Sequence, residues 1–500
     1  MRVVLVSPYP DITAFGVRGI SASLRASGVD TRLVFLPDPL GDALRELPER
    51  YPPTVMDDLV ALCADADLVG VSLMTNYVDN AVQITRAVKA RLDVPVLWGG
   101  IHPTIRPAEC LETADMVCVG DGEAAILDVC RALAAGNPVE AIPNIQSRRP
   151  DGTVAANPVR PLARDLDALP PPDWSHQDHH IWDGGDRLVP LTPDRTRTFL
   201  ARGTLSRALG KVGYQTMTDR GCPHRCTYCV NDAVKALYGA KGYLRWRSVE
   251  HVMAELEDAV RRMPFIGYVW ISDDAFFARP LAAIREFCRQ YKERIGLPFT
   301  CLGSPATITP EKMDALVDAG MIYLQMGVQS GSARIQALFG RQSMGNDKIL
   351  AAMAVINSYK DRMLPPSYDI ILDTPYETPA DRLETVRFIS RIPKPFRLQL
   401  FSLVLYPGTK LAAMAAADGL LTDERRQVYA KSYTMRVPDY LNFLTLLAKD
   451  GWFPSRLLAF LASGPVVAVL GSRVFSPVWR PAFAASGPVW RLVKRILGRP

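Results

Sequence analysis

Short apolar runs alternate with longer amphipathic stretches along most of this 500-residue chain. In the N-terminal part, the apolar runs predict strands separated by helical segments, at 2–6, 31–36, 68–72, 94–98 and 115–119. Strands that alternate with helices indicate a parallel sheet, because each parallel strand needs a crossover connection. We therefore expect a doubly wound, Rossmann-like α/β domain whose ligand site lies at the carboxyl ends of the strands.

A second alternating series follows a polar, proline-rich stretch. Its strands are predicted at 214–218, 268–272, 299–303, 322–328, 368–372 and 398–404. Helices are predicted between and after them at 248–262, 279–294, 310–319, 332–339, 345–359 and 379–391. This series predicts a partial, TIM-like (β/α)6 barrel, in which the chemistry takes place at the C-terminal ends of the strands.

The last 70 residues have a different pattern, with ten Lys and Arg against two Asp, and ten aromatic residues. Their apolar run at 457–470 is too short to span a bilayer. The final helical pattern combines one apolar face with neighbouring basic residues: Val489, Trp490, Val493, Ile496 and Leu497 beside Arg491, Lys494 and Arg495. Such a helix is typical of a membrane interface. The alternative is a basic helical cap over the open side of the barrel.

The overall composition is that of an ordinary globular protein, with 48% hydrophobic and 22% charged residues. A net charge of +6 is too small to predict nucleic-acid binding, and we expect none. The apolar run at 3–6 is too short for the core of a secretory signal, so the cysteines are expected to be reduced. We expect a cytoplasmic protein, with peripheral contact to the inner face of the membrane through residues 431–500.

The stretch RGCPHRCTYC, residues 220–229, holds three of the nine cysteines with the spacing Cys222-x3-Cys226-x2-Cys229. A disulfide would leave one of them over, and reduced cysteines this close are usually metal ligands or redox catalysts. A zinc ion wants a fourth protein ligand, and the nearby His224 lies on the same tight loop. A four-iron cluster with three cysteine ligands keeps one iron open for chemistry. The spacing therefore favours an iron–sulfur cluster over zinc or a chance arrangement.

The cysteine spacing, with Tyr228 before the last cysteine, resembles the signature loop of the radical S-adenosylmethionine (radical SAM) enzymes. The resemblance implies that the three cysteines bind a [4Fe–4S] cluster whose open iron chelates SAM, and that Tyr228 lies against the adenosine. It also implies that one electron, from an external donor of the flavodoxin or ferredoxin type, cleaves SAM to methionine and a 5′-deoxyadenosyl radical.

The predicted barrel strand ends strengthen this resemblance. GVQSGS at 327–332, followed by GRQS at 340–343, resembles the radical SAM stretch that contacts the methionine and ribose of SAM, although many relatives have glutamate where Gln329 stands. YPGT at 406–409 is another recurring feature of this group. The implied SAM-binding residues, besides Tyr228, are Asp273, Asp274, Gln329, Ser330, Ser332 and Arg341. Capping of a following helix is the alternative role for the two aspartates and the two serines.

Three turns in the N-terminal part, SLMT at 72–75, WGGIHP at 98–103 and VGDGE at 119–123, follow predicted strands. Their glycines would let a bulky ligand lie against bare backbone. Together they resemble the cobalamin-binding domain that precedes the radical SAM barrel in one large subclass. The resemblance implies cobalamin contacts from Thr13, Ser72, Thr75, Gly99, Gly100, His102, Gly120, Gly122 and Glu123.

The stretch DITAFG at 11–16 stands where many cobalamin proteins have D-x-H-x-x-G, so Thr13 takes the place of the cobalt-binding histidine. Threonine is a poor cobalt ligand, and we expect base-off cobalamin without a protein histidine ligand. His102 is expected to contact the periphery of the cofactor or a neighbouring loop.

These patterns predict a cobalamin-binding domain at 1–136, a proline-rich linker at 137–205, a radical SAM domain at 206–430 and a basic helical region at 431–500. The linker contains LPPPDWS at 169–175, which resembles the element before the barrel in these enzymes; its Trp174 is a packing plug between domains or a substrate contact. Cys301, in the third barrel strand, is either packed in the core or a hydrogen donor to the active site.

The predicted function is that of a cobalamin-dependent radical SAM C-methyltransferase. It would act on an unactivated carbon of a small-molecule substrate, either lipid-like or another secondary metabolite. The first alternative is a rearrangement or oxidative cyclisation in which cobalamin only transfers electrons. A methylthiotransferase is disfavoured, because the first domain lacks three cysteines arranged for a second cluster. The alternative from another class is a non-catalytic, membrane-associated cobalamin sensor.

Overall fold

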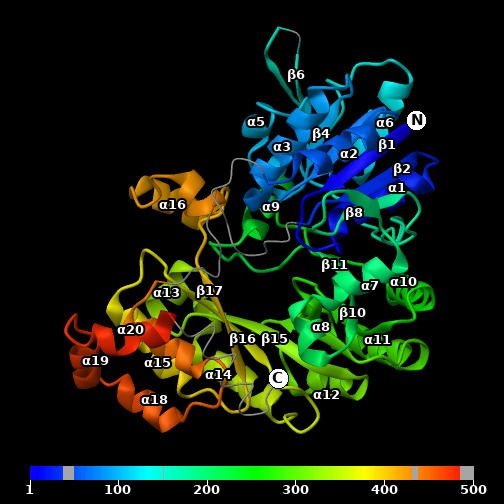
Figure 1. Cartoon of the computed structure of the whole chain (residues 1–500). Helices are drawn as coiled ribbons and strands as arrows, with labels where there is room; N and C mark the ends of the chain where they lie inside the picture. The colour runs from blue at the N-terminus through cyan, green and yellow to red at the C-terminus, as the bar shows by residue number, and fades with distance from the viewer. Residues whose placement is uncertain (38–49, 150, 431–436, 485–500) are drawn as a thin grey trace. The chain divides into compact units, whose positions relative to one another are not determined.

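The computed structural model describes residues 1–37, 50–149, 151–430 and 437–484 (Figure 1). The chain divides into two compact units, which are treated separately below. The first unit comprises Met1–Cys222, Tyr228–Gly267 and Leu405–Lys431, and the second comprises Pro223–Thr227, Tyr268–Val404 and Ser432–Pro500.

The first sheet has nine strands in the order β7-β6-β5-β4-β3-β1-β2-β8-β9. Its parallel centre consists of β1 (Arg2–Ser7), β2 (Asp30–Phe35), β3 (Leu68–Ser72), β4 (Val96–Gly99) and β5 (Met116–Cys118). Apart from β2, these strands are almost continuously apolar, as expected for a parallel sheet covered by helices on both faces. The predicted α/β fold with a parallel sheet is confirmed.

The helices of this domain connect the parallel strands. Helix α1 (Phe15–Ala26) packs against α6 (Glu123–Ala134), and α2 (Pro53–Cys63) packs against α3 (Val78–Lys89). Shorter elements fill the strand-end turns: η1 (Thr75–Tyr77), α4 (Ile101–Ile105) and α5 (Pro107–Cys110). Because the helices cover the sheet faces, a ligand can reach the backbone mainly at the strand ends.

Residues 137–205, predicted as a linker, contribute four strands to the edges of the first sheet. These are β6 (Ile145–Arg148), β7 (Val154–Ala156), β8 (His179–Trp182) and β9 (Leu188–Pro190). Strand β8 pairs parallel with β2, whereas β6, β7 and β9 pair antiparallel. Edge strands tolerate proline and polar residues, which is why this polar stretch gave no clear strand pattern.

The element LPPPDWS is held by buried polar contacts within the first unit. The Asp173 carboxylate accepts a hydrogen bond from Ser21 Oγ (2.6 Å) and pairs with Arg25 Nε (2.9 Å). The guanidinium of Arg18 lies 3.5 Å from the centre of the Trp174 ring, which also packs against Tyr214. The described contacts of Trp174 are therefore those of a packed side chain.

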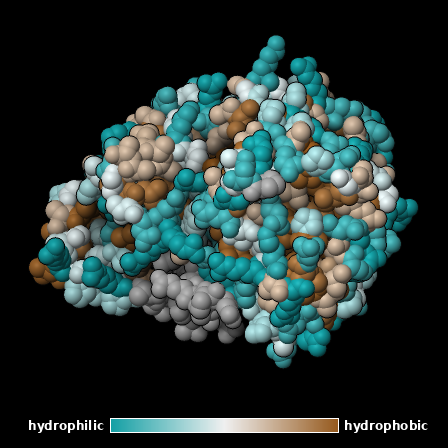
Figure 2. All heavy atoms as spheres, turned by 90° about the horizontal axis from the view of Figure 1, so that it is seen from above, coloured by the Kyte–Doolittle hydropathy of each residue, from teal (hydrophilic) through white to brown (hydrophobic). Residues whose placement is uncertain are grey.

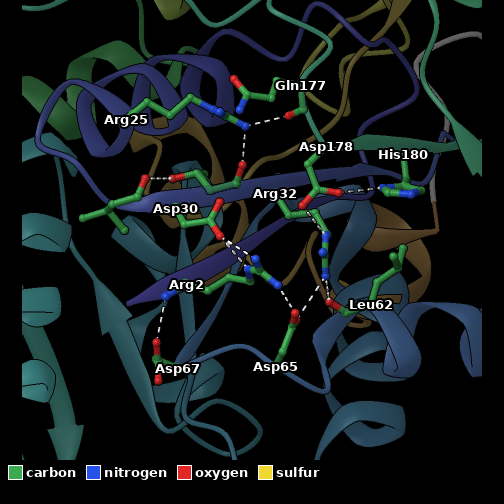
Figure 3. Close-up of polar contacts among 12 residues, drawn as sticks. Arg2, Arg25, Asp30, Arg32, Leu62, Asp65, Asp67, Gln177, Asp178 and His180 are labelled. Atoms are coloured by element: carbon green, nitrogen blue, oxygen red, sulfur yellow. Dashed lines mark hydrogen bonds and ion pairs between the residues drawn. The ribbon is translucent and has the colours of Figure 1, made fainter.

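A second polar network holds the amino-terminal ends of β1 and β2, opposite to the strand-end turns (Figure 3). Arg2 pairs with Asp30 (2.6 Å) and with Asp65. Arg32 pairs with Asp178 (2.9 Å) and with Asp65 (3.3 Å). At this edge, arginine side chains pair with Asp30, Asp65 and Asp178, and the backbone N–H of Arg2 donates to Asp67 (2.7 Å).

The second sheet has six strands in the order β10-β13-β14-β15-β16-β17, in which each strand neighbours the next along the series. The strands are β10 (Val212–Thr216), β13 (Ile266–Ile271), β14 (Phe299–Gly303), β15 (Met321–Gln329), β16 (Ser367–Leu372) and β17 (Arg397–Ser402). The pairs from β13 to β17 are parallel. This curled parallel sheet confirms the predicted partial barrel.

Helices follow these strands as the sequence pattern predicts. They are α10 (Val249–Arg262), α11 (Leu281–Arg294), α12 (Pro310–Asp318), α13 (Ala333–Leu338), α14 (Asn346–Asn357) and α15 (Pro379–Ile389). Two short helical turns, η2 (Phe276–Ala278) and η3 (Gln342–Met344), lie in the connections. Along β15, the side chains of Leu324, Met326 and Val328 are fully buried, while Tyr323 and Gln325 on the other face are half-buried. The less buried face carries the polar residues that a barrel interior can offer a substrate.

The remaining elements of the first unit are α7 (Pro193–Ala201), α8 (Thr204–Leu209), β11 (Asp219–Arg220), α9 (Val230–Tyr238), β12 (Arg245–Trp246), α16 (Lys410–Ala417) and η4 (Arg425–Tyr429). The C-terminal helices belong to the second unit: α17 (Tyr440–Ala448), α18 (Ser455–Leu461), α19 (Gly464–Leu470) and α20 (Ser476–Ala484).

The C-terminal helices extend the outer layer of the barrel. Helix α17 packs against α15, and α18 and α20 lie against this pair (Figure 1). The predicted helical nature of this region is confirmed, whereas the apolar face at 489–497 lies outside the described residues. Within the described part of the chain, no helix has the length and hydropathy needed to cross a membrane.

Candidate cofactor sites

A cavity of about 350 Å³ lies at the carboxyl ends of β3, β4 and β5, within the first unit. Its wall includes the glycines at the strand-end turns and apolar side chains such as Val71 and Ile126. Pro170 and Pro172 of the LPPPDWS element contribute to the lining as well. The cavity therefore lies where a doubly wound sheet binds its ligands.

Several lining glycines leave open space where other residues would carry a side chain. A Cβ atom on Gly16 or Gly99 would come no closer than 3.9 Å to Ser72 Oγ or Cys118 Cβ, respectively. A Cβ on Gly19 would lie 3.8 Å from Glu123 Oε1. These glycines expose bare backbone to the cavity, and a bare wall fits a flat macrocycle such as a corrin better than it fits a small, polar ligand.

Two other glycines are required by the fold. Gly100 has φ +104°, and a Cβ there would lie 2.6 Å from the carbonyl oxygen of Leu73. Gly120 has φ +85°, and a Cβ there would lie 1.9 Å from the hydroxyl oxygen of Tyr238. Tyr238 therefore occupies the space that the missing side chain of Gly120 leaves.

Most residues predicted to bind cobalamin line the cavity: Ser72, Gly99, Gly100, Gly120, Gly122 and Glu123. Thr13, Thr75 and His102 are buried outside its described lining. The Thr13 backbone N–H donates to Asp11 Oδ1 (2.9 Å), which keeps this turn closed.

His102 makes its described contacts with protein groups. Its Nδ1 lies 3.2 Å from Thr75 Oγ1, and its ring packs edge-on against Tyr429, from η4. Burial, together with the nearby Arg106, lowers the pKa of His102 to about 4, so the imidazole is neutral at pH 7. The Tyr429 hydroxyl in turn donates to Glu109. These contacts match the neighbouring-loop alternative for His102.

The cavity also contains lining residues that the strand-end motifs did not indicate: Asp219, Arg220, Arg247 and His251. Among the described lining residues, His251 is the only histidine, and its Nδ1 accepts a hydrogen bond from Arg247 Nε (3.0 Å). These residues come from 217–251, so only the tertiary structure brings them to the cavity. Apart from Arg220, which opens the cysteine stretch, nothing in their local sequence distinguishes them from ordinary surface residues.

The cysteine loop leaves β11 through Gly221, which has φ +94° and lies so close to Tyr243 that a Cβ would be 2.4 Å from its carbonyl oxygen. Cys226 is buried, while Cys222 and Cys229 are half-buried. Within the second unit, Arg341 Nη1 lies 3.6 Å from Cys226 Sγ, and Arg341 Nη2 donates to the carbonyl of Gly327 (2.6 Å). Arg341 thus places a positive charge beside the Cys226 thiol and connects the cysteine loop to β15.

The spacing of the three cysteines is the ground on which an iron–sulfur cluster is expected rather than a single ion. In the described part of the chain, no group of three or more His, Cys, Asp and Glu side chains is arranged around one metal position. A [4Fe–4S] cluster binds each cysteine at a different iron, so its ligands need not converge on one point.

The serines predicted to bind SAM are engaged by the protein. Ser332 caps α13, and its Oγ donates to Asp381 Oδ1 on α15 (2.7 Å). Ser330 Oγ lies 3.2 Å from Thr385 Oγ1, also on α15. Both serines are fully buried, and these contacts correspond to the capping alternative. Gln329, before them, has φ +75° at a bulge in β15.

The other predicted residues lie in different environments. Asp273 is fully buried with Arg279 Nη2 at 3.8 Å, whereas Asp274 is exposed. Tyr228 is half-buried on the cysteine loop. Cys301 is buried with its Sγ 3.2 Å from Met321 Sδ, and burial raises the pKa of its thiol far above the usual value. The described contact of Cys301 is therefore a packing contact.

An acidic side chain on β16 is a candidate that the motifs did not indicate. Asp369 interrupts the apolar strand, and Gln325 Nε2 on β15 donates to both of its carboxylate oxygens (2.9 and 3.1 Å). Burial raises the pKa of Asp369 to about 7, and the Gln325 hydrogen bonds only partly offset this. A polar residue within a buried strand was the available signal.

Comparison with known proteins agrees with this geometry. Residues 1–129 match the B12 binding domain family, and residues 218–389 match the radical SAM superfamily. The chain is a radical SAM enzyme with an N-terminal B12-binding domain. The two families imply a [4Fe–4S] cluster, SAM and cobalamin as cofactors.

Among sequence relatives, an uncharacterized methyltransferase of Pyrococcus horikoshii is 27% identical over 71% of each chain. The cytidylyl-2-hydroxyethylphosphonate methyltransferase of Streptomyces wedmorensis is 26% identical over 56% of this chain and 53% of its own length. The anaerobic magnesium-protoporphyrin IX monomethyl ester cyclase of Rubrivivax gelatinosus is 24% identical over 53% of this chain and 44% of its own. This chain thus spans about half of the latter two proteins.

Two solved structures share the fold. The radical SAM methyltransferase TsrM from Kitasatospora setae has a TM-score of 0.63 at 18% identity, covering 83% of this chain and 76% of its own. The cobalamin-dependent SAM radical enzyme OxsB has a TM-score of 0.63 at 15% identity, covering 87% of this chain and 64% of its own. At these identities, the likeness concerns the fold alone.

Proposed function

We propose that this radical SAM enzyme is a cobalamin-dependent C-methyltransferase that acts on an unactivated carbon of a lipid-like or other secondary-metabolite substrate. The observation that carries the proposal is the cavity whose wall is bare at Gly16, Gly19 and Gly99. The methyltransferases among the sequence relatives support methyl transfer as the outcome. When bound, SAM and the cluster supply the radical, and cobalamin supplies the methyl group.

The chain's own residues would hold and orient these groups. Cys222, Cys226 and Cys229 would ligate the cluster, with Arg341 beside Cys226. SAM would be bordered by Tyr228, by Gln329 and by the strand ends that carry Asp273, Asp274, Ser330 and Ser332. The glycine-lined wall would hold cobalamin, and the Thr13 position argues for a base-off form without a histidine ligand. An external flavodoxin or ferredoxin type protein would supply the electron.

The proposed substrate class is supported by the surface of the C-terminal helices. Phe460 on α18, Val474 before α20 and Val478 on α20 are 61%, 81% and 72% exposed. Figure 2 shows exposed hydrophobic side chains at the left of the view, the side on which Figure 1 labels α19. Arg456, Arg473 and Arg480 accompany them in the sequence. Apolar side chains with basic neighbours suit an anionic membrane surface, and a lipid-like substrate would be reached there.

A vesicle co-sedimentation assay tests this membrane contact. We expect the protein to bind vesicles that contain the anionic lipid phosphatidylglycerol and to bind vesicles of zwitterionic phosphatidylcholine less. A Phe460→Ser/Val478→Ser variant should bind several-fold less, because both side chains are exposed and their loss leaves the core intact. If the pellet contains the same amount of protein with and without vesicles, the membrane contact is contradicted. The helices α18–α20 would then serve only as an outer layer of the barrel.

A second candidate function is an oxidative cyclisation or rearrangement in which cobalamin transfers electrons. It is favoured by the similarity to the anaerobic cyclases of Rubrivivax gelatinosus and of a Synechocystis strain, which are 24% and 26% identical. This reaction would consume SAM without forming S-adenosylhomocysteine.

The deciding experiment uses anaerobically reconstituted protein with cobalamin, SAM, a strong reductant and a membrane-lipid extract. Quantifying 5′-deoxyadenosine and S-adenosylhomocysteine together separates the candidates. Equal, lipid-dependent amounts of both products are expected for the methyltransferase. Lipid-dependent deoxyadenosine alone would indicate the cyclase or rearrangement, and neither product with any extract would contradict a lipid substrate. Cys226→Ala is the matched control, because it removes only a cluster ligand.

A further inference from the structure

Two arginines face each other on the ribbon that leads into the cysteine loop. Strands β11 and β12 pair antiparallel, with Arg220 directly opposite Arg245. Like charges at directly opposed positions destabilise a strand pair. We refer to β11 and β12 as the arginine ribbon and ask which groups neutralise its two arginines.

The neutralising groups lie on the turn after β5, residues 120–123, which we refer to as the acidic turn. Arg220 Nη2 lies 2.5 Å from Glu123 Oε1, and Arg220 Nη1 lies 3.6 Å from Asp121 Oδ2. Arg245 Nη2 lies 3.3 Å from the same Asp121 oxygen. The side chains of Glu123 and Arg245 are largely buried, so solvent screens these contacts poorly. Arg220 therefore pairs with both acids of this turn, and Arg245 pairs with Asp121.

The acidic turn also holds the chain on the far side of the cysteine loop. Helix α9 begins directly after Cys229 and ends at Tyr238. The backbone N–H of Asp121 donates to the Tyr238 hydroxyl oxygen (2.8 Å), which fills the space left by Gly120. Arg220 lies two residues before Cys222. One four-residue turn thus contacts both flanks of the loop that carries the cysteines.

The same turn is part of the cavity wall, where Asp121, Gly122, Glu123 and Arg220 line the described cavity. We infer that the acidic turn and the arginine ribbon form an electrostatic clamp through which occupancy of the cavity and cluster binding by the cysteine loop promote each other. A ligand that holds the acidic turn in place keeps both arginines neutralised and both flanks of the loop fixed. Glu123 and Arg220 act as positioning residues in this device.

The inference depends on the proposed cofactors of the two sites, but neither on methyl transfer nor on a lipid substrate. Its test needs no turnover, so its failure is distinguishable from failure of the proposed function. Because coupling between two binding events is reciprocal, cluster loading must strengthen cobalamin binding by the factor with which cobalamin strengthens cluster binding.

The test measures the dissociation constant of hydroxocobalamin by absorbance titration, for protein with a reconstituted cluster and for iron-free protein. In the unaltered protein, we expect cluster loading to tighten binding about tenfold. The ratio of the dissociation constant of the iron-free protein to that of the cluster-loaded protein should approach one in Glu123→Gln and in Arg220→Gln. The double variant should show the same ratio as each single variant. Arg187→Gln is the matched control; it removes an exposed arginine–aspartate pair with Asp58, outside the cavity lining, and should keep the full ratio.

A ratio that stays unchanged in Glu123→Gln and Arg220→Gln would overturn the inference, as would a ratio of one in the unaltered protein. If Arg220→Gln fails to retain a cluster, Glu123→Gln alone decides, because it leaves the ribbon and the loop unaltered. Hydrogen exchange of residues 219–229 gives an independent readout. Cobalamin should slow this exchange in the unaltered protein and in Arg187→Gln, but not in Glu123→Gln. Equal slowing in all three would contradict the clamp.

Discussion

The two sheets use similar-looking strand-end turns in different ways. At the end of β4 in the first sheet, Gly99 leaves open space toward a cavity. At the end of β15 in the second sheet, Ser330 and Ser332 are fully buried and bonded to α15. A polar residue at a strand end can bind a ligand only with the hydrogen-bonding capacity that the protein leaves unused. A missing side chain is therefore better evidence of a ligand site than a serine whose hydroxyl already has partners.

The cysteine loop should give the largest effect. Cys226→Ala removes a proposed cluster ligand, so we expect cluster absorbance to be lost and 5′-deoxyadenosine formation to fall at least about 100-fold. The control is Cys288→Ala on α11, a buried thiol whose pKa burial raises to about 12. It should keep the cluster. Deoxyadenosine formation that survives in Cys226→Ala would contradict the assignment of this loop.

Filling the cavity should have the next largest effect and tests the first half of the comparison. A Cβ on Gly99 lies 3.9 Å from Cys118 Cβ, so Gly99→Ala and Gly99→Val should fold while their side chains occupy cavity space. We expect cobalamin affinity to fall about tenfold in Gly99→Val and less in Gly99→Ala. Equilibrium dialysis with hydroxocobalamin measures this. Unchanged affinity in the valine variant would place the ligand elsewhere.

The capping network tests the second half of the comparison. Asp381 accepts hydrogen bonds from Ser332 and Thr378, and it pairs with Arg334. Asp381→Ala should therefore destabilise the barrel by about 2–4 kcal/mol, measured by denaturant unfolding. Ser332→Ala should cost about 1 kcal/mol as a lost cap.

The same Ser332→Ala variant distinguishes capping from SAM binding. A role in capping alone leaves the SAM dissociation constant within about twofold of the original, after correction for folded protein. A tenfold weaker SAM affinity at unchanged stability would show that the serine serves the ligand despite its contacts, and the contrast between the two sheets would then fail.

The last prediction is a pH dependence of stability that comes from Asp369. Its folded pKa of about 7 lies above the unfolded value near 3.9, so the folded state retains a proton that the unfolded state has lost. The contribution of Asp369 to the free energy of unfolding is therefore fully present below pH 4 and is lost as the pH rises toward 7. Between pH 5 and pH 8, we expect Asp369→Asn to gain about 2 kcal/mol relative to the original protein. Parallel stability curves for the two proteins would contradict this assignment.

Much of the fold followed from local patterns. The central strands of both sheets and the barrel helices lie within a few residues of their predicted positions, because periods of two and 3.6 residues are properties of short segments. The cysteine spacing and the glycine turns were likewise readable one motif at a time. The edge strands between 145 and 190 were not, because short edge strands with prolines and polar residues lack a distinctive period.

The sequence by itself determined the two kinds of domain, the cysteine loop and the glycine turns, since each depends on neighbouring residues. Only the tertiary structure decided which strand-end groups are already used and which distant residues meet. It pairs Arg220 with Glu123 across 97 positions, and it places Tyr238 against Gly120. Such contacts depend on how whole elements pack, because the free energy of an ion pair or a buried hydroxyl is set by its three-dimensional surroundings.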